Sequence, residues 1–126
     1  MALTGQGKYP IDVLVALPGG VYRYEPKDHR LVRVLAGDIR EKIPTQDAFK
    51  KAAMITLYVL NQDKTSRIEW ADIEIGCMSQ DLYLESAALG MGSRIFASVK
   101  INDVTKILGL KESQILRIAQ AAGPTK

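Results

Sequence analysis

Cysteine and histidine are nearly absent from this sequence, which holds one of each, Cys77 and His29. A single cysteine excludes an intrachain disulfide, and together the two offer too few ligands for a zinc centre built from cysteine and histidine. Their scarcity also argues against the His–Asp and Cys–His constellations of acyl transfer and against zinc-dependent hydrolysis. We therefore expect neither a metal site nor a nucleophilic catalytic residue.

Aromatic residues and long apolar runs are also scarce. Aromatics make up 6% of the chain, the Lys and Arg residues are scattered, and no aromatic-basic ladder appears, which argues against a nucleic-acid-binding surface. The formal net charge of +3 is only a weak bias towards anionic partners such as phosphates. Met1–Pro10 carries no long apolar stretch, so we expect no signal peptide, no membrane span and a cytoplasmic location.

What the sequence does contain is an ordinary globular composition. Its 126 residues are 47% apolar and 25% charged, which suits one domain with a modest core. Apolar segments bounded by Gly and Pro predict an antiparallel meander of three strands, at Ile11–Leu17, Val21–Glu25 and Leu31–Leu35. Ala53–Leu60 is apolar almost throughout, which indicates a strand in the centre of a sheet.

The longest helical pattern covers Asp72–Leu89. Apolar residues occupy so much of its circumference that we expect the helix to be packed on several sides. Cys77 is then a packed thiol, Trp70 packs at the helix start, and Gly90-Met91-Gly92 forms the C-terminal cap. If Gly92 has a positive φ, a Gly92→Val change should destabilise this turn.

Shorter elements complete the pattern. Two short helices are predicted, one capped by Thr45 and one capped by Asn102 or Asp103 and ended by Gly109. Two further strands are predicted at Arg94–Ala97 and Ile115–Ala122. Strands interleaved with helices predict an α+β fold, with a mixed, mainly antiparallel sheet packed around one long buried helix.

Two parts of the sequence resemble a known family. Ser86–Ser93, Ser-Ala-Ala-Leu-Gly-Met-Gly-Ser, resembles the Ala-Leu-Gly-Leu-Gly-Ser-like turn that ends the buried helix of the nitroreductase family, the FMN-dependent oxidoreductases. The order of elements over residues 71–126 also follows that family. Lys8–Val13 and Gly19–Pro26, continued by His29 and Leu31, resemble the pattern of its SagB-type dehydrogenase branch.

The resemblance implies a nitroreductase-like domain over residues 1–126. Such an enzyme transfers hydride from NAD(P)H through FMN to a nitro, quinone or similar small substrate, and the flavin itself carries the chemistry. A homodimer is implied, because the flavin of this family lies at a subunit interface. Family members also carry an N-terminal segment whose Arg-Arg-Ser-x-Arg-like motif grips the FMN phosphate, whereas this chain begins just before the Gly-rich loop. A flavin-free binding or assembly module and a fragment of a larger enzyme are therefore alternatives.

The two ends of the chain supply part of the implied cofactor site. By family position, Gly5, Gln6 and Lys8 would face the flavin ring or the ribityl chain, and Lys126 stands near a basic residue that contacts the phosphate. Glycine permits close backbone approach, while Gln and Lys can donate to carbonyl and polyol oxygens. A polar N-terminal loop and a solvated terminal lysine are the structural alternatives.

The segment after the long helix supplies the rest. In the family, the turn corresponding to Gly90 and Gly92 lies beside the cofactor, and the backbone N–H groups at Ala97 and Ser98 would meet flavin N5 and O4. A helix cap and a strand exit are the structural alternatives. A substitute for the arginine motif would be Arg40, Arg67 or Arg94, if folding brings one of them to the cleft.

Overall fold

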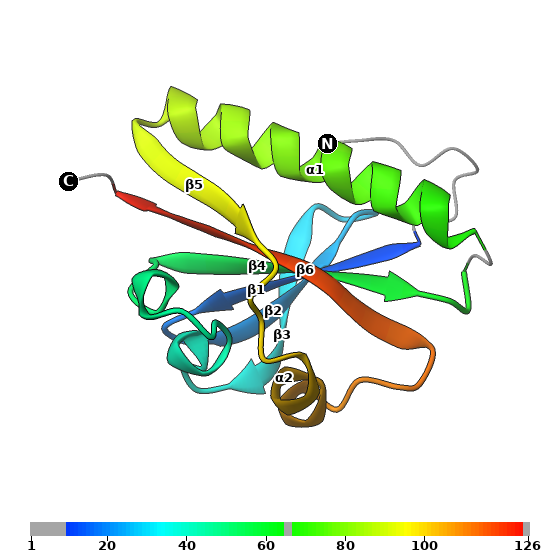
Figure 1. The fold of residues 1–126 in the computed structure, drawn as a ribbon. Helices are drawn as coiled ribbons and strands as arrows, with labels where there is room; N and C mark the ends of the chain where they lie inside the picture. Colours follow the sequence, from blue (N-terminus) through cyan, green and yellow to red (C-terminus); the bar gives the residue numbers. More distant parts are fainter. Residues whose placement is uncertain (1–9, 65–66, 125–126) are drawn as a thin grey trace.

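The computed structural model describes residues 10–64 and 67–124 (Figure 1). Its strands are β1 (Ile11–Leu17), β2 (Gly20–Glu25), β3 (Arg30–Ala36), β4 (Met54–Asn61), β5 (Met91–Phe96) and β6 (Gln114–Pro124). They form one sheet in the order β3-β2-β1-β4-β6-β5, and each neighbouring pair is antiparallel. The predicted α+β class with a mainly antiparallel sheet is confirmed, and so is the meander of β1, β2 and β3.

Helices cover the two faces of this sheet. The long helix α1 (Ile68–Ala88) crosses one face, and α2 (Ile101–Leu108) lies on the other with the 3-10 helices η1 (Arg40–Lys42) and η2 (Asp47–Phe49) (Figure 1). The larger cluster of buried side chains lies on the α2 side, and a smaller cluster lies under α1. The sheet is therefore the middle layer of the fold.

Strand β4 shows why a nearly continuous apolar sequence predicts a central position. It lies between β1 and β6. Leu57 and Val59 pack into the core on the α2 side, whereas Tyr58 and Leu60 pack under α1. Because side chains alternate between two covered faces, apolar residues are needed at almost every position of the strand.

Helix α1 differs from the prediction in its start and in its packing. It begins at Ile68, so Trp70 lies inside the first turn, with the Arg67 guanidinium carbon 4.2 Å from its ring centre. Among the described residues, only one face of the helix is buried; on the other, Ile73 is 65% and Leu84 61% exposed. The described residues do not enclose the helix on several sides as expected, and the prediction of a packed Cys77 is wrong because Cys77 is exposed.

Three local predictions also need correction. Neither η2 nor α2 has a side-chain cap: η2 follows Gln46 instead of Thr45, and α2 follows Lys100, so Asn102 and Asp103 lie inside the helix. Gly109, at φ 64°, ends α2 as predicted. The glycine with positive φ after α1 is Gly90, at 71°, whereas Gly92 is part of β5; the strain argument for Gly92→Val is therefore wrong.

Within the described residues, no helix combines the length and the apolar character needed to cross a bilayer.

Candidate functional site

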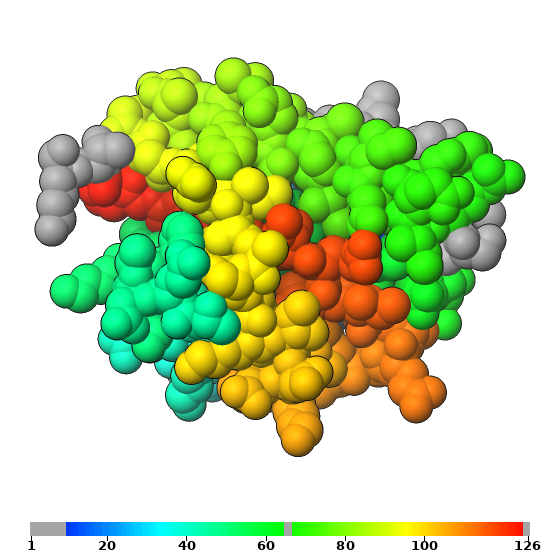
Figure 2. Space-filling view, viewed as in Figure 1, coloured from blue at the N-terminus to red at the C-terminus, as the bar shows by residue number. Residues whose placement is uncertain are grey.

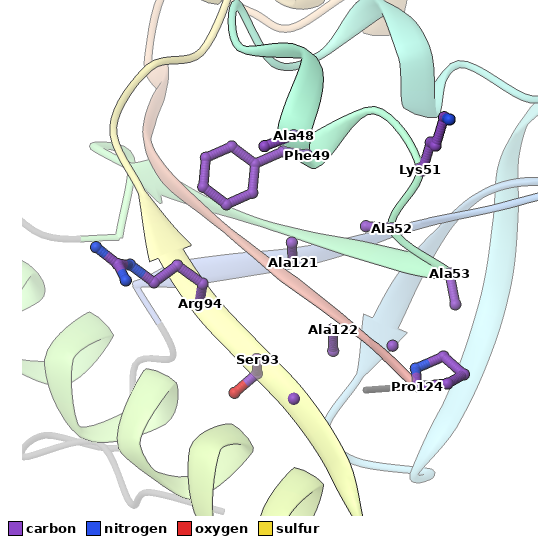
Figure 3. Close-up of a pocket in the computed structure, with 12 residues that line it drawn as sticks. Ala48, Phe49, Lys51, Ala52, Ala53, Ser93, Arg94, Ala121, Ala122 and Pro124 are labelled. Carbon is purple, nitrogen blue, oxygen red and sulfur yellow. The ribbon is translucent and has the colours of Figure 1, made fainter. Parts of the chain in front are cut away.

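Two concave surfaces lie along strand β5: Gly92, Ser93 and Arg94 line the first, and Ile95 lines the second. Of the predicted site residues, Gly92 lines the first. The first is an open cleft of about 340 Å³ between the segment from η2 to β4 and the paired ends of β5 and β6 (Figure 3). Small residues form most of its lining: Ala48, Ala52, Ala53, Ala121, Ala122, Gly92 and Gly123. Because these side chains are small, they leave an open space over the sheet.

Two basic residues flank this cleft, and none of the residues that line it is acidic. Arg94 comes from β5 and Lys51 from the segment before β4, and Figure 3 shows their side chains pointing away from each other. Phe49 stacks on Phe96 with ring centres 4.3 Å apart, which fixes η2 against β5. The cleft is therefore mildly cationic, but its two charges do not converge on one point.

Arg40 holds one wall of the cleft in place. Its guanidinium donates to the carbonyl oxygens of Ala52 at 3.1 Å and Ala53 at 3.0 Å, and it pairs with Asp38 at 2.7 Å. Side-chain and backbone hydrogen bonds from Arg40 lower the pKa of Asp38 to about 2. The Arg40 side chain is therefore occupied by these structural contacts and is not available to bind a phosphate.

This pairing predicts a pH dependence of stability. Because the folded pKa of Asp38 lies below the ordinary value of about 3.9, its contribution is present above about pH 4 and is lost as the pH falls towards 2. We expect Asp38→Asn to be less stable than the unmodified chain at neutral pH and equally stable near pH 2, measured by denaturant unfolding. The control is Asp28→Asn, which removes an exposed partner 3.5 Å from Arg30. A stability difference for Asp38→Asn that does not change with pH would contradict the assignment.

The second concave surface is a notch of about 250 Å³ between α1, β5 and β6. Ile75 and Gly76 of α1, Ile95 of β5 and Ile118 of β6 give it apolar walls. At its rim, Arg117 binds the Asp72 carboxylate through two hydrogen bonds of 3.0 and 2.7 Å, so the two charges compensate each other. The notch is therefore mainly apolar, with a neutralised ion pair beside it.

Beyond Ile95, which lines this notch, the chain leaves β5 with two unused backbone donors, at Ala97 and Ser98; neither residue lines the notch itself. The Ile95 N–H donates to the Tyr83 hydroxyl, at 2.6 Å. Beyond it, the carbonyls of Ala97 and Ser98 accept hydrogen bonds from Val99 and Thr45, both at 2.8 Å. The N–H groups of Ala97 and Ser98 donate to no group in the described part of the chain. Both amides are thus free to donate to a bound molecule.

The structure divides the predicted cofactor-binding residues. Gly90 precedes β5, Gly92 lies in it, and Ala97 and Ser98 follow its end. At the usual rise of a strand, Gly92 and Ala97 lie roughly 17 Å apart. Gly5, Gln6, Lys8 and Lys126 lie outside the described residues. The described residues therefore do not gather into one site.

The candidate arginines and His29 lie in different parts of the structure. Of the three candidate arginines, Arg94 lines the cleft, Arg40 is held by Asp38, and Arg67 lies over Trp70. His29 is exposed, and its Nδ1 lies 2.8 Å from the Tyr24 hydroxyl.

Sequence reasoning did not find the Arg117–Asp72 pair. The two residues lie 45 positions apart, on a strand and a helix, and nothing local in the sequence links them.

The comparisons with known proteins agree with this fold. The model of the nitroreductase family matches residues 4–123. The chain is 26% identical, over 125 residues, to MJ1384 of Methanocaldococcus jannaschii, named as a nitroreductase, covering 86% of this chain and 63% of that protein.

Two crystal structures have the same fold. A protein from Ralstonia eutropha, described as a nitroreductase, matches with a TM-score of 0.89 and 27% identity, over 98% of this chain and 61% of its own. A nitroreductase from Desulfovibrio desulfuricans in complex with FMN matches with a TM-score of 0.68 and 20% identity, over 98% and 66%. The chain thus spans about six tenths of the length of MJ1384 and of the Ralstonia protein. By the family match over nearly its whole length, this chain belongs to the nitroreductase family.

Proposed function

We propose that this protein is an FMN-dependent oxidoreductase of the SagB-type branch, which passes hydride from NAD(P)H through FMN to a nitro, quinone or similar small substrate. Family membership supports a flavin-type oxidoreductase, and the Desulfovibrio relative is a complex with FMN. The observation that carries the proposal is the pair of free amides, Ala97 and Ser98, which follow in sequence shortly after Ile95, a residue that lines an apolar notch. Bound flavin would supply the redox chemistry.

The notch suits a flat, mainly apolar ring with hydrogen-bond acceptors on its edge. Ile75, Ile95 and Ile118 offer apolar walls, and the amides of Ala97 and Ser98 offer donors that are not used inside the chain. Preorganised backbone donors stabilise negative charge that develops on a ring atom without having to reorganise. The residues of this chain would thus position the ring and tune its electronics, and no catalytic side chain is required of them.

A substitution that removes one amide tests this assignment. Proline has no N–H, so we expect Ala97→Pro to weaken FMN binding about tenfold, the effect of one lost hydrogen bond of about 1.4 kcal/mol. FMN affinity would be measured by quenching of flavin fluorescence. Ala97→Gly, which keeps the N–H, is the matched control and should bind as the unmodified chain does. Equal affinity in the proline variant, with thermal melting unchanged, would remove Ala97 from the site.

We also propose a homodimer that uses the outer face of α1. This helix forms one outer surface of the molecule (Figure 2), and large apolar side chains at Trp70, Ile73 and Leu84 are exposed on it. The small residue Cys77 lies between them on the exposed side, where it permits close approach of a second helix. An apolar stripe on a helix that is buried on its other face favours a packing partner, and a second copy supplies the same stripe.

A further inference from the structure

A tyrosine of α1 supports the end of β5. The helix packs mainly against this strand (Figure 1), and the Tyr83 hydroxyl accepts a hydrogen bond of 2.6 Å from the Ile95 N–H. Because β5 is the last strand of the sheet, its outer edge has no neighbouring strand that could accept from this N–H. The Tyr83 hydroxyl therefore takes the place that a carbonyl of a neighbouring strand would otherwise fill.

This hydrogen bond lies at the start of the segment that carries the two unused amides. On the α2 side of the sheet, Phe96 is buried in the core, and the Ser98 carbonyl oxygen accepts from the Thr45 N–H at 2.8 Å. Tyr83 supplies the support from the α1 side, two residues before Ala97. The positions of the Ala97 and Ser98 N–H groups are thus fixed from both faces of the sheet.

Tyr83 itself does not line the notch, whereas Ile95, its hydrogen-bond partner, does. The tyrosine can therefore act on a ring bound there only through the strand. Without the hydroxyl, the Ile95 N–H would lose its one acceptor among the described residues, and an unpaired donor in a partly buried strand is unfavourable. The end of β5 would then have to shift, or admit water, to satisfy that N–H.

We propose that Tyr83 is a positioning residue of the candidate flavin site, which holds Ile95 and so keeps the N–H groups of Ala97 and Ser98 directed at a bound ring. Groups that bind a ligand need to stay within about 0.5 Å of their productive positions. A shift of the strand end therefore weakens binding without removing any group that touches the ring. The inference rests on the proposed function and deepens it, because it adds to the two amides a side chain that holds them in place.

The test compares Tyr83→Phe with the unmodified chain. Phenylalanine keeps the aromatic ring and removes only the acceptor for Ile95. FMN affinity, measured by quenching of flavin fluorescence, should fall about tenfold, as if one amide contact were lost. Amide hydrogen exchange, followed by NMR, gives a readout that does not depend on activity. Without FMN, the Ile95 amide should exchange faster in the variant. Saturating FMN should slow the exchange of the Ala97 and Ser98 amides in the unmodified chain and far less in Tyr83→Phe.

Tyr58→Phe is the matched control. It also removes a hydrogen-bonded tyrosine hydroxyl, because Tyr58 donates to Gln120 at 2.7 Å, but this contact joins β4 to β6 and involves no residue of β5. The control variant should melt at a lower temperature and still bind FMN as the unmodified chain does. FMN should protect its Ala97 and Ser98 amides to the same extent.

Three results would overturn the inference, each for a different reason. An unmodified chain that binds no FMN would remove the proposed function and the role of Tyr83 with it. If the unmodified chain binds FMN, equal affinity and equal amide protection in Tyr83→Phe would leave the proposed function intact and remove only the positioning role. Equal weakening of FMN binding by Tyr83→Phe and Tyr58→Phe would attribute the effect to a general loss of stability.

Discussion

Replacing Gly20 with alanine is expected to cost the fold about 3 kcal/mol and to lower the melting temperature by roughly 10 °C. Gly20 begins β2 with φ of 148°, and a Cβ there would collide with the carbonyl oxygen of Leu35 on β3. That oxygen belongs to the backbone of the paired strand, so it cannot move aside without disturbing the β2–β3 ladder. The free-energy costs of backbone strain and of the steric clash therefore add. Denaturant unfolding measures the sum of the two costs.

Two neighbouring glycines separate these contributions. Gly37 has φ of 94° but open space where a Cβ would be, so Gly37→Ala should cost only the backbone term, about 1 kcal/mol. At Gly19 the nearest atom is the hydroxyl at the far end of the flexible Tyr22 side chain, and Gly19→Ala should be nearly neutral. If Gly20→Ala were no more destabilising than Gly37→Ala, the close approach of Leu35 would be wrong.

Gln120→Leu is expected to cause the second large loss of stability, lowering the free energy of unfolding by about 2–3 kcal/mol. Gln120 is fully buried; its Oε1 accepts from the Tyr58 hydroxyl at 2.7 Å, and its Nε2 donates to the Ser79 carbonyl oxygen at 3.0 Å. One side chain thus joins β4, β6 and α1. Burial raises the pKa of Tyr58, so its hydroxyl stays a protonated donor and is left unpaired in the leucine variant.

A double-mutant cycle shows whether this network behaves as a unit. Adding Tyr58→Phe to Gln120→Leu removes the orphaned hydroxyl, so the double variant should be more stable than the sum of the single changes predicts, by about 1 kcal/mol. Unfolding free energies of the four proteins give the coupling. Simple additivity of the two changes would mean that the hydrogen bond contributes nothing specific.

The strands were predictable because their signals are local. Alternating apolar residues between Gly and Pro turns placed β1, β2 and β3 within about one residue of their observed bounds. The start of α1 was not predictable in this way, because Arg67 precedes it without a side-chain cap. Nor could the sequence show that Ile73 and Leu84 are exposed, since periodicity reveals apolar positions and not whether their partner belongs to the same chain.

The candidate site was predictable only in part. The family resemblance implied that the backbone N–H groups of Ala97 and Ser98 contact the flavin. In the structure, these N–H groups donate to no group within the described residues. The notch depends on contacts between residues far apart in sequence, such as Asp72 with Arg117 and Tyr83 with Ile95. Such pairs cannot be predicted from the composition of the chain or from the periodicity of its apolar residues.

The most direct test of the flavin proposal is the visible absorption of the protein after incubation with FMN, desalting and size-exclusion chromatography with mass determination. We predict flavin bands that elute with the protein in a peak of dimer mass. Protein that elutes without colour would contradict it, favour a flavin-free module or a fragment of a larger enzyme, and remove the assigned roles of Ala97 and Ser98.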